Sequence, residues 1–494
     1  MHDDHPSAAN GGANADGAPR THGAADADGC PHHGEQDEPN RATEPGADAG
    51  ADGRAADETP PDRRPSDQRG VSRRAFGKAA VAIGGATALS ACLDRFGDGA
   101  VPSGVEDPGT LPDGQHVWDE FLGLDDHDNR LSPRHHVVLL VNLTSEGVPS
   151  AGDRETVETA LRSLEGAYEW STDGLLFTIG YAPRYFDRFD ADPDGVALPE
   201  PEPMAPFEDI EPDRPDAVLH LASDRPDVVM EAEEALFGEV DAANGRGMDA
   251  TFDGVFARPD LEDTTARRTG FVGEGLPADH TDVDGVPEDA PVDEESPLFM
   301  NFKSGFEKTQ ATESFVTIES GGFAGGTTQH LSKIRLNLQQ WYEQDNRDQR
   351  VGKMFCPVHA EEDRVEGPGH NLGTDSGMDD ACTEDVGESA REHGLVGHSQ
   401  KMAADAREDD SPLMIRRDFD STDDGHAGLH FLSVQQSIGD FVETREAMNG
   451  TDITDSSGVG QRLNNGILQY FSVQRRGNYL LPPRALRALP PADP

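Results

Sequence analysis

Apolar residues gather in short runs along this chain, and polar stretches separate the runs. Residues 136–143 (HVVLLVNL) form a continuous apolar run that is typical of a buried strand, and residues 155–164 place apolar side chains at helical spacing. The same reasoning predicts a helix at 227–237 and further strands at 175–181, 217–221 and 251–257. This order, β-α-β followed by β-α-β, is that of a ferredoxin-like split βαβ unit.

The second half of the chain repeats this order loosely. Its predicted elements are strands at 315–319 and 329–338, a helix at 346–355, a strand at 429–435, a helix at 438–448 and a short last strand at 479–481. Residues 260–297 and 356–412 are polar, so we expect connections there, the longer one being a functional loop or lid. We therefore predict an α+β protein with two ferredoxin-like domains, at 131–298 and 299–494.

The first 130 residues have no such pattern. Residues 1–70 are rich in Asp, Ala, Gly, Pro and Glu, so we expect a disordered acidic extension, and 93–130 are interpreted as an acidic linker. Within the extension, a solvated tail and a tether for a transition metal are the alternatives. The residues that favour the tether are His2, His5, His22, Cys30, His32 and His33.

Residues 71–92 have the features of an export signal. Arg73 and Arg74 precede a short, weakly apolar segment with small residues at its end, as in a twin-arginine signal. The closing Leu-Ser-Ala-Cys is similar to a lipobox, which makes Cys92 the candidate lipidation site. We expect export by the twin-arginine route to the extracellular face of the membrane, with a lipid anchor. The alternative is a chance Arg-Arg pair before an amphipathic helix.

Composition and charge narrow the class of protein. The chain has 494 residues and a net charge of −54, from 95 acidic and 41 basic side chains, of which only six are lysines. This composition indicates a halophile, because at molar salt the screening length is only about 3 Å and carboxylate repulsion largely disappears. It argues against nucleic acid as a partner. No run approaches the roughly 20 apolar residues that span a bilayer, so no transmembrane span is expected.

Six segments follow one another in an order that resembles a known family. They are 175–189 (LLFTIGYAPRYFDRF), Gly325–Thr327 with 333–341, His398, Ile415–Arg417, 428–435 and Gly477–Pro483. Together they resemble the dye-decolorising (DyP-type) haem peroxidases, in particular the exported deferrochelatase/peroxidase-like branch, over roughly residues 131–485. That family has two ferredoxin-like domains in a dimeric α+β barrel arrangement.

The resemblance implies roles for individual residues. His398 matches the proximal ligand of the iron of haem b, and Arg416 matches the distal arginine, which stabilises charge as the O–O bond breaks. Lys333 and His330 are implied as further haem-contacting residues. The alternatives without a role in catalysis are that His398 is a solvated loop histidine and that Arg416 pairs with surface carboxylates.

The chain also departs from the family pattern. The family's distal aspartate lies in a Gly-x-x-Asp-Gly motif, where this chain has Asn301 to Gly305 with Ser304 at the aspartate position. Serine is a poor base at neutral pH, so Ser304 is expected at most to hold a water that relays the proton. Ser332 replaces an arginine that the family often places near a haem propionate.

Cys356 and Cys382 allow three interpretations. They are a disulfide, free thiols, or part of a zinc site with His359, His370 and His393. For the whole chain we expect an exported haem b peroxidase that uses H₂O₂ and a small reducing substrate, with a homo-oligomeric assembly. The alternatives are a deferrochelatase-like haem-handling protein and a non-catalytic surface lipoprotein with the same fold.

Overall fold

The computed structural model describes residues 99–408 and 411–494. The predicted twin-arginine signal, the lipidation candidate Cys92 and the acidic extension lie outside the described residues. Within the described part no helix is long and apolar enough to cross a membrane.

The first half forms a four-stranded antiparallel sheet with the order β10-β3-β6-β4. Its strands are β3 (His135–Leu143), β4 (Leu176–Tyr181), β6 (Ala217–Ser223) and β10 (Arg267–Phe271), and its two long helices are α3 (Ala151–Ala167) and α5 (Pro226–Leu236). Numbered along the chain, the strand order is 4-1-3-2, the ferredoxin-like order. A capping box between Ser150 and Asp153 starts α3 and satisfies free N–H groups of its first turn.

The second half repeats this order. Its sheet runs β17-β11-β16, followed by β15 and β14, again antiparallel and again 4-1-3-2 along the chain. The strands are β11 (Thr327–Leu336), β14 (Ile415–Arg416), β15 (Phe419–Ser421), β16 (Gly428–Gln435) and β17 (Phe471–Leu481). The helices are α7 (Arg347–Met354), α8 (Pro357–Glu361), α9 (Asp380–Thr383), α10 (Val386–His393), α11 (His398–Asp405), α12 (Ile438–Asn449) and α13 (Thr451–Ser456).

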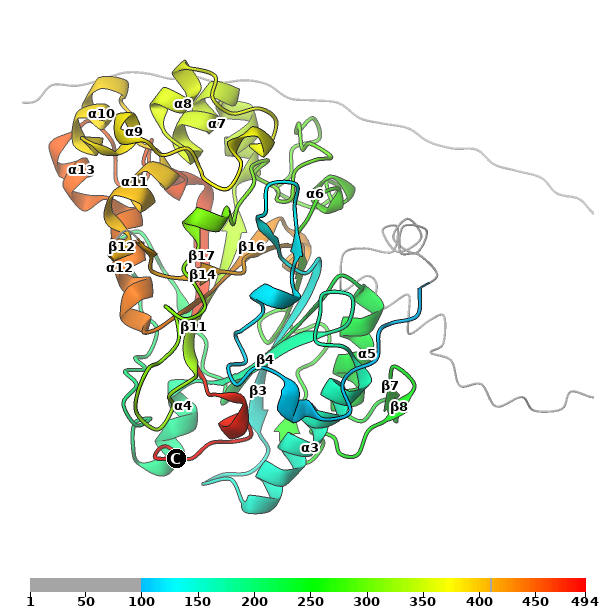
Figure 1. Ribbon diagram of the computed structural model, residues 1–494. Coiled ribbons are helices and arrows are strands. Elements are labelled where there is room, and N and C mark those ends of the chain that lie inside the picture. Colours follow the sequence, from blue (N-terminus) through cyan, green and yellow to red (C-terminus); the bar gives the residue numbers. More distant parts are fainter. Residues whose placement is uncertain (1–98, 409–410) are drawn as a thin grey trace, which may run out of the picture. The chain divides into compact units, whose positions relative to one another are not determined.

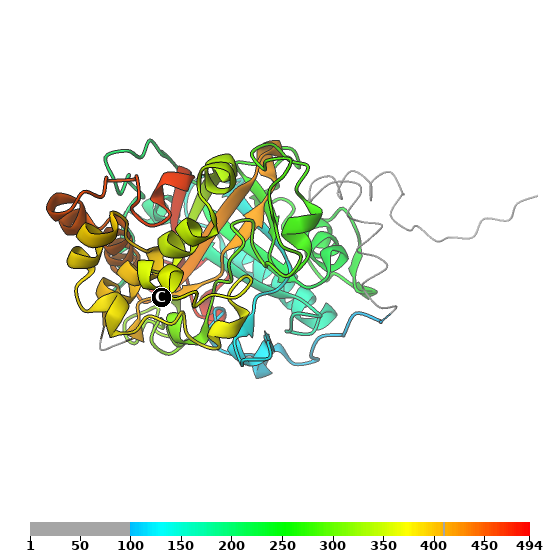
Figure 2. The same ribbon diagram turned by 90° about the horizontal axis from the view of Figure 1, so that it is seen from above.

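The two sheets join into one closed barrel. β10 pairs with β15 at Phe271 and Asp420, and β17 pairs with β4 at Leu480 and Tyr181. Figure 1 shows the strands of both halves in the middle of the molecule, and in Figure 2 the yellow and orange helices of the second half lie to one side of them. The predicted α+β class with two ferredoxin-like units in a barrel is thus confirmed.

Several predicted elements were wrong in detail. Only Phe256–Ala257 (β9) of the predicted strand 251–257 pairs with β3, and the fourth strand is β10, inside the predicted connection 260–297. Residues 315–317 form a turn and a bend, and 318–319 have no regular structure, so the strand predicted at 315–319 is absent. The polar stretch 356–412 contains the helices α8 to α11, which its composition did not indicate.

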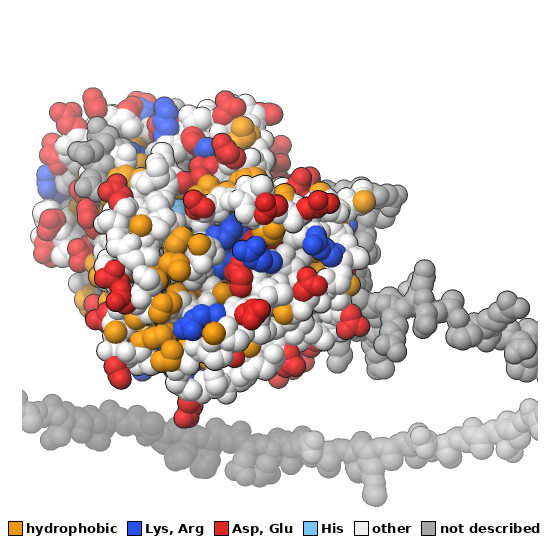
Figure 3. All heavy atoms as spheres, turned by 60° about the horizontal axis from the view of Figure 1, so that its bottom comes forward, with side chains coloured by type: hydrophobic (Ala, Val, Ile, Leu, Met, Phe, Trp, Pro, Cys, Tyr) orange, Lys and Arg blue, Asp and Glu red, His pale blue; other side chains and the backbone are white. Residues whose placement is uncertain are grey.

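Short elements complete the described fold. They are β1 (Gly123–Leu124), β2 (Arg130–Leu131), α4 (Pro183–Phe186), β5 (Glu211–Pro212), β7 (Ala242–Ala243), β8 (Arg246–Gly247), α6 (Leu276–Asp279), β12 (Arg407–Glu408) and β13 (Ser411–Pro412). Acidic side chains are spread over the face shown in Figure 3, and basic ones form only a few groups there.

Candidate functional site

A cavity of about 330 Å³ lies in the second half, between its sheet and its helices. Strands β11, β16 and β17 contribute Ile334, Phe431 and Val473 to one wall, and helices α11 and α12 contribute Met402 and Met448 to the other. Most lining side chains are apolar, as in sites for small molecules and cofactors. The cavity can therefore hold a largely apolar ligand.

His398 is the first residue of α11 and lines this cavity from the helical wall. The start of α11 packs directly on the end of α7. A Cβ added to Gly397 would lie 1.8 Å from the Phe355 carbonyl oxygen, so only glycine fits before the histidine. The Gln400 N–H also donates to that oxygen at 3.1 Å. These contacts fix where the imidazole enters the cavity.

The imidazole of His398 is uncharged. Burial, together with the nearby positive charges of Lys401, Arg416 and Arg445, lowers its pKa to about 3. Its Nδ1 is buried and has no hydrogen-bond partner among the described residues. A neutral imidazole with unengaged nitrogens is the form that binds a metal ion.

Arg416 lines the same cavity from the sheet wall, where β14 pairs with β16. The side chain of Gln310 brackets its backbone, because Gln310 Oε1 accepts from the Arg416 N–H and Gln310 Nε2 donates to the Arg416 carbonyl, each at 3.0 Å. The guanidinium donates through Nη2 to Thr309 Oγ1 at 3.0 Å, and its buried Nε has no partner. Arg416 is thus a held cation with a donor left free.

The other predicted site residues lie in different places. Ser304 lines the cavity but is exposed. Lys333 does not line it, because the alternation along β11 turns its side chain to the other face, where Nζ pairs with Asp424 at 2.7 Å. His330 lies beneath Ser332, with Nε2 2.8 Å from Ser332 Oγ, and its ring stacks on Phe441 at 3.5 Å.

Two carboxylates in the cavity wall were not anticipated from the sequence. Asp418 and Asp420 both line the cavity together with Arg416. The residues between them point the opposite way. Arg417 donates to the His116 carbonyl at 2.6 Å, and the Phe419 ring stacks on His136 at 4.4 Å. The alternation of a strand explains this arrangement, and the pattern Arg416-x-Asp418-x-Asp420 is the signal that would have revealed it.

An arginine pair at the cavity was also missed. Arg476 lies directly opposite Ser332 in the pairing of β17 with β11. It therefore places a positive charge beside the position where the family often has an arginine and this chain has Ser332. Arg476 and Arg445 both pair with Glu208 at 2.8 Å. Two guanidinium groups share one carboxylate, and Nε and Nη1 of Arg476 are buried without a partner. The two arginines can therefore bind a further carboxylate, one that belongs to a ligand.

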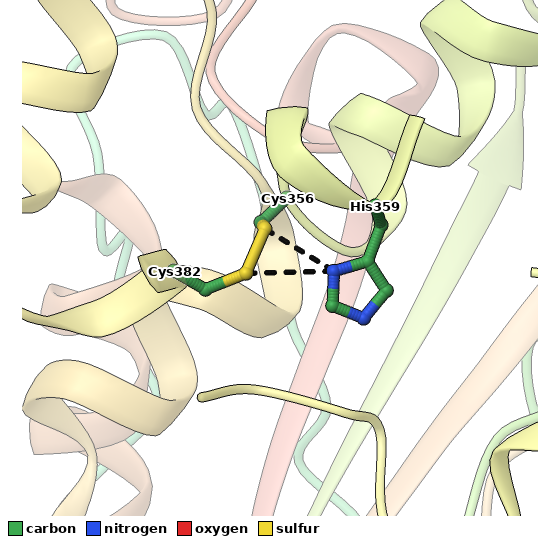
Figure 4. Close-up of side chains that lie close together, drawn as sticks. All are labelled: Cys356, His359 and Cys382. Atoms are coloured by element: carbon green, nitrogen blue, oxygen red, sulfur yellow. Dashed lines mark hydrogen bonds between the residues drawn. A yellow bond between two sulfur atoms is a disulfide. The ribbon is translucent and has the colours of Figure 1, made fainter. Parts of the chain in front are cut away.

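Behind α11, Cys356 and Cys382 form a disulfide (Figure 4). His359 Nδ1 lies 3.2 Å from Cys356 Sγ and 3.4 Å from Cys382 Sγ, and all three side chains are buried. The same three residues offer a metal ion three ligands. His393 instead contacts Glu361 at 3.1 Å, and His370 lies 3.9 Å from Glu274 and Glu295, so neither supplies the fourth ligand of a zinc site.

Comparison with protein families finds one family that matches most of the described residues. A family model described as a family of unknown function (DUF7405) matches residues 133–483. The chain belongs to this family. No curated protein matches the sequence of this DUF7405 member.

The DUF7405 chain is also similar to solved structures. A dye-decolorizing peroxidase from Bacteroides thetaiotaomicron is 14% identical, with 74% of this chain and 98% of that chain covered and a TM-score of 0.46. A DypB variant from Rhodococcus jostii in complex with heme is 14% identical, with coverages of 76% and 98% and a TM-score of 0.45. A dye-decolorizing protein from Vibrio cholerae is 11% identical, with coverages of 75% and 98% and a TM-score of 0.43.

Proposed function

We propose that the chain is a haem peroxidase of the dye-decolorising type, which uses H₂O₂ to oxidise a small reducing substrate. One observation carries the proposal: His398 and Arg416 face one apolar cavity from its helical wall and its sheet wall. An uncharged imidazole and a held guanidinium on either side of an apolar space are the protein groups that haem-based reduction of peroxide requires.

The cavity fits haem b in three respects. Its apolar lining suits the macrocycle, and His398 supplies a neutral nitrogen for the iron. Arg476 and Arg445 suit the acidic groups of haem, because Arg476 has two buried N–H-bearing nitrogens without a partner. The arginine that Ser332 lacks is thus provided by the neighbouring strand. Lys333 and His330 do not line the cavity.

The bound haem would supply the electrons that reduce peroxide. The chain's own residues would hold the haem and orient the peroxide. His398 would hold the iron from the helical wall, and Arg416 would keep a positive charge beside the peroxide as negative charge develops on the departing oxygen. The apolar residues around them exclude water, which strengthens this electrostatic interaction.

An absorbance spectrum tests the proposal. The protein is purified in high salt and titrated with haemin, beside His398→Ala and a matched control, His393→Ala, whose histidine contacts Glu361 away from the cavity. We expect a Soret band in the wild type and the control, and its loss in His398→Ala. A wild type without the band, or an unchanged band in His398→Ala, would overturn the proposal.

A second function, deferrochelatase-like handling of haem, is favoured by one observation. The Nδ1 of His398 has no acceptor among the described residues, whereas an iron-bound histidine that donates its second N–H is a stronger ligand. A weakly held iron suits a protein that removes iron from haem. Iron release without peroxide, together with negligible peroxide turnover, would favour this second function.

The proposal includes export. The twin-arginine route carries folded proteins, so haem could be inserted before export. The disulfide between Cys356 and Cys382 supports this location, since disulfides persist in oxidising compartments. Anchoring through Cys92 and adaptation to molar salt belong to the same proposal, and they rest on the sequence.

A further inference from the structure

The cavity has Ser304 at the position where the family pattern has an aspartate that accepts a proton. Ser304 is exposed, and its hydroxyl is a poor base at neutral pH. Reduction of H₂O₂ needs a group that takes a proton from one peroxide oxygen and returns it to the other. The question is which other side chain in the wall can do so.

Two carboxylates share the wall with Arg416, and they differ in their contacts. The carboxylate of Asp420 is buried and accepts a hydrogen bond from the Phe299 N–H, so it holds the backbone of the loop before β11 in place. Asp418 forms no hydrogen bond with any other residue in the described ranges, and its side chain is half-buried in the cavity wall. Asp418 is therefore the carboxylate left free to meet a ligand.

The position of Asp418 also matches the task. It follows Arg416 by two residues on the same side of the chain, so the cation that stabilises the departing oxygen and the carboxylate are neighbours. Burial raises the pKa of the Asp418 carboxyl, and the charge of Arg416 opposes that rise. A carboxyl whose pKa is raised by burial, next to a cation, can accept a proton and return it.

We propose that Asp418 is the catalytic carboxylate of this cavity, which moves the peroxide proton in place of an aspartate at position 304. The inference rests on the proposed function. In the full reaction one H₂O₂ takes two electrons and two protons from the reducing substrate and gives two molecules of water. Asp418 takes one proton from one peroxide oxygen and returns it to the other before that oxygen leaves as water. The carboxylate therefore ends each cycle as it began.

The test compares Asp418→Asn, which keeps the shape of the side chain, with Asp455→Asn as the matched control, because Asp455 is an exposed residue of α13 that does not line the cavity. Ser304→Ala is added as the variant that tests the alternative proton relay. Each variant is first titrated with haemin to establish its Soret band. Hydrogen cyanide is then mixed with it and association is followed at that band. Cyanide, like peroxide, must give up a proton to bind iron, but no turnover follows. The decay of H₂O₂ is measured separately.

We expect unchanged haemin binding in all three variants. Asp418→Asn should lower the rates of cyanide association and of peroxide consumption by about 10²- to 10³-fold, whereas Asp455→Asn should leave them unchanged and Ser304→Ala should lower them far less than Asp418→Asn. Formate should restore part of the rate in Asp418→Ala, because a free carboxylate can enter the space of the missing side chain. Asp418→Glu should be intermediate.

The outcomes separate the two proposals. If the wild type shows no Soret band, the proposed function and the role of Asp418 fail together. If haemin binds normally but Asp418→Asn keeps both rates within about threefold of the wild type, only the role of Asp418 is overturned. A large loss of both rates in Ser304→Ala with none in Asp418→Asn would assign the proton transfer to a water held at Ser304.

Discussion

The two halves of the barrel have the same strand order but differ in what fills the space between sheet and helices. In the first half α3 and α5 bury continuous apolar faces, which include Val157, Leu161 and Leu164 on α3. In the second half α11 buries Gln400 and Lys401, and α12 buries an arginine beside two apolar residues. The first half is a packed core, and the second keeps a cavity. Helix composition, rather than topology, distinguishes the half that has the cavity from the half that is closely packed.

The unpaired polar atoms support the same conclusion. Nδ1 of His398, Nε of Arg416 and two nitrogens of Arg476 are buried without partners, and all three residues line the cavity. Buried donors are nearly always satisfied in native proteins. These four atoms can form hydrogen bonds with a ligand in the cavity, and buried atoms without a partner also lie elsewhere in the described part, such as Nε1 of Trp170 and Nη2 of Arg484.

Truncating one apolar side chain in each half should show the contrast most strongly. Leu164→Ala removes a fully buried side chain from the packed half and should lower the free energy of unfolding by about 2–5 kcal/mol. Met448→Ala only enlarges the existing cavity and should cost less than about 1 kcal/mol. Urea unfolding in high salt measures both. Equal losses would mean that the second half is as closely packed as the first.

Removing the disulfide should destabilise the second half by about 2–4 kcal/mol, since it closes a loop between residues 26 apart in sequence. The effect should reach His398, because Gln400 Nε2 donates to the Cys382 carbonyl at 2.7 Å. Haemin affinity of Cys356→Ser should therefore fall, while hydrogen exchange in β3 and β6 should stay unchanged.

Treating the wild type with a reductant and with a chelator decides between a disulfide and a metal site. A disulfide predicts that a reductant lowers the melting temperature of the wild type and that a chelator does not. The opposite pattern would mean that Cys356, His359 and Cys382 hold a metal ion in solution.

Much of the fold could be predicted because apolar runs mark its central strands. β3, β4, β6 and β16 and the helices α3, α5 and α12 lie close to their predicted ranges. β10 escaped detection because Arg267 and Arg268 are buried there through pairs with Glu233 and Asp213, which are distant in sequence. Helix α11 was missed because its buried residues are polar and are satisfied by other elements.

The site could be predicted only in part for a related reason. Motif order led to His398 and Arg416, which line one cavity. The cation opposite Ser332 depends on the register of β17 against β11, which local sequence does not encode. Asp418 could have been predicted from the sequence, because alternation along a strand places its side chain on the same side as that of Arg416.

The smallest expected effect is a pH dependence that belongs to the packed half. His136 and His220 are buried side by side, with 2.9 Å between His136 Nδ1 and His220 Nε2. The Nε2–H of His136 donates to the Pro133 carbonyl, so its Nδ1 must accept from His220, and both rings are neutral. Burial lowers the pKa of His136 to about 3 and that of His220 well below its ordinary value, with Arg417 adding to both shifts.

Between these folded-state pKa values and about 6.5, the unfolded chain binds more protons than the folded one. Stability should therefore fall as pH is lowered from 7 to 5.5, with each such histidine contributing at most about 1.4 kcal/mol per pH unit. Replacing His220 by Gln should reduce the slope of unfolding free energy against pH by that amount. An unchanged slope in His220→Gln would mean that acid sensitivity arises elsewhere, and the cavity half, where burial lowers the pKa values of His398, His330 and His430, would be the next place to measure it.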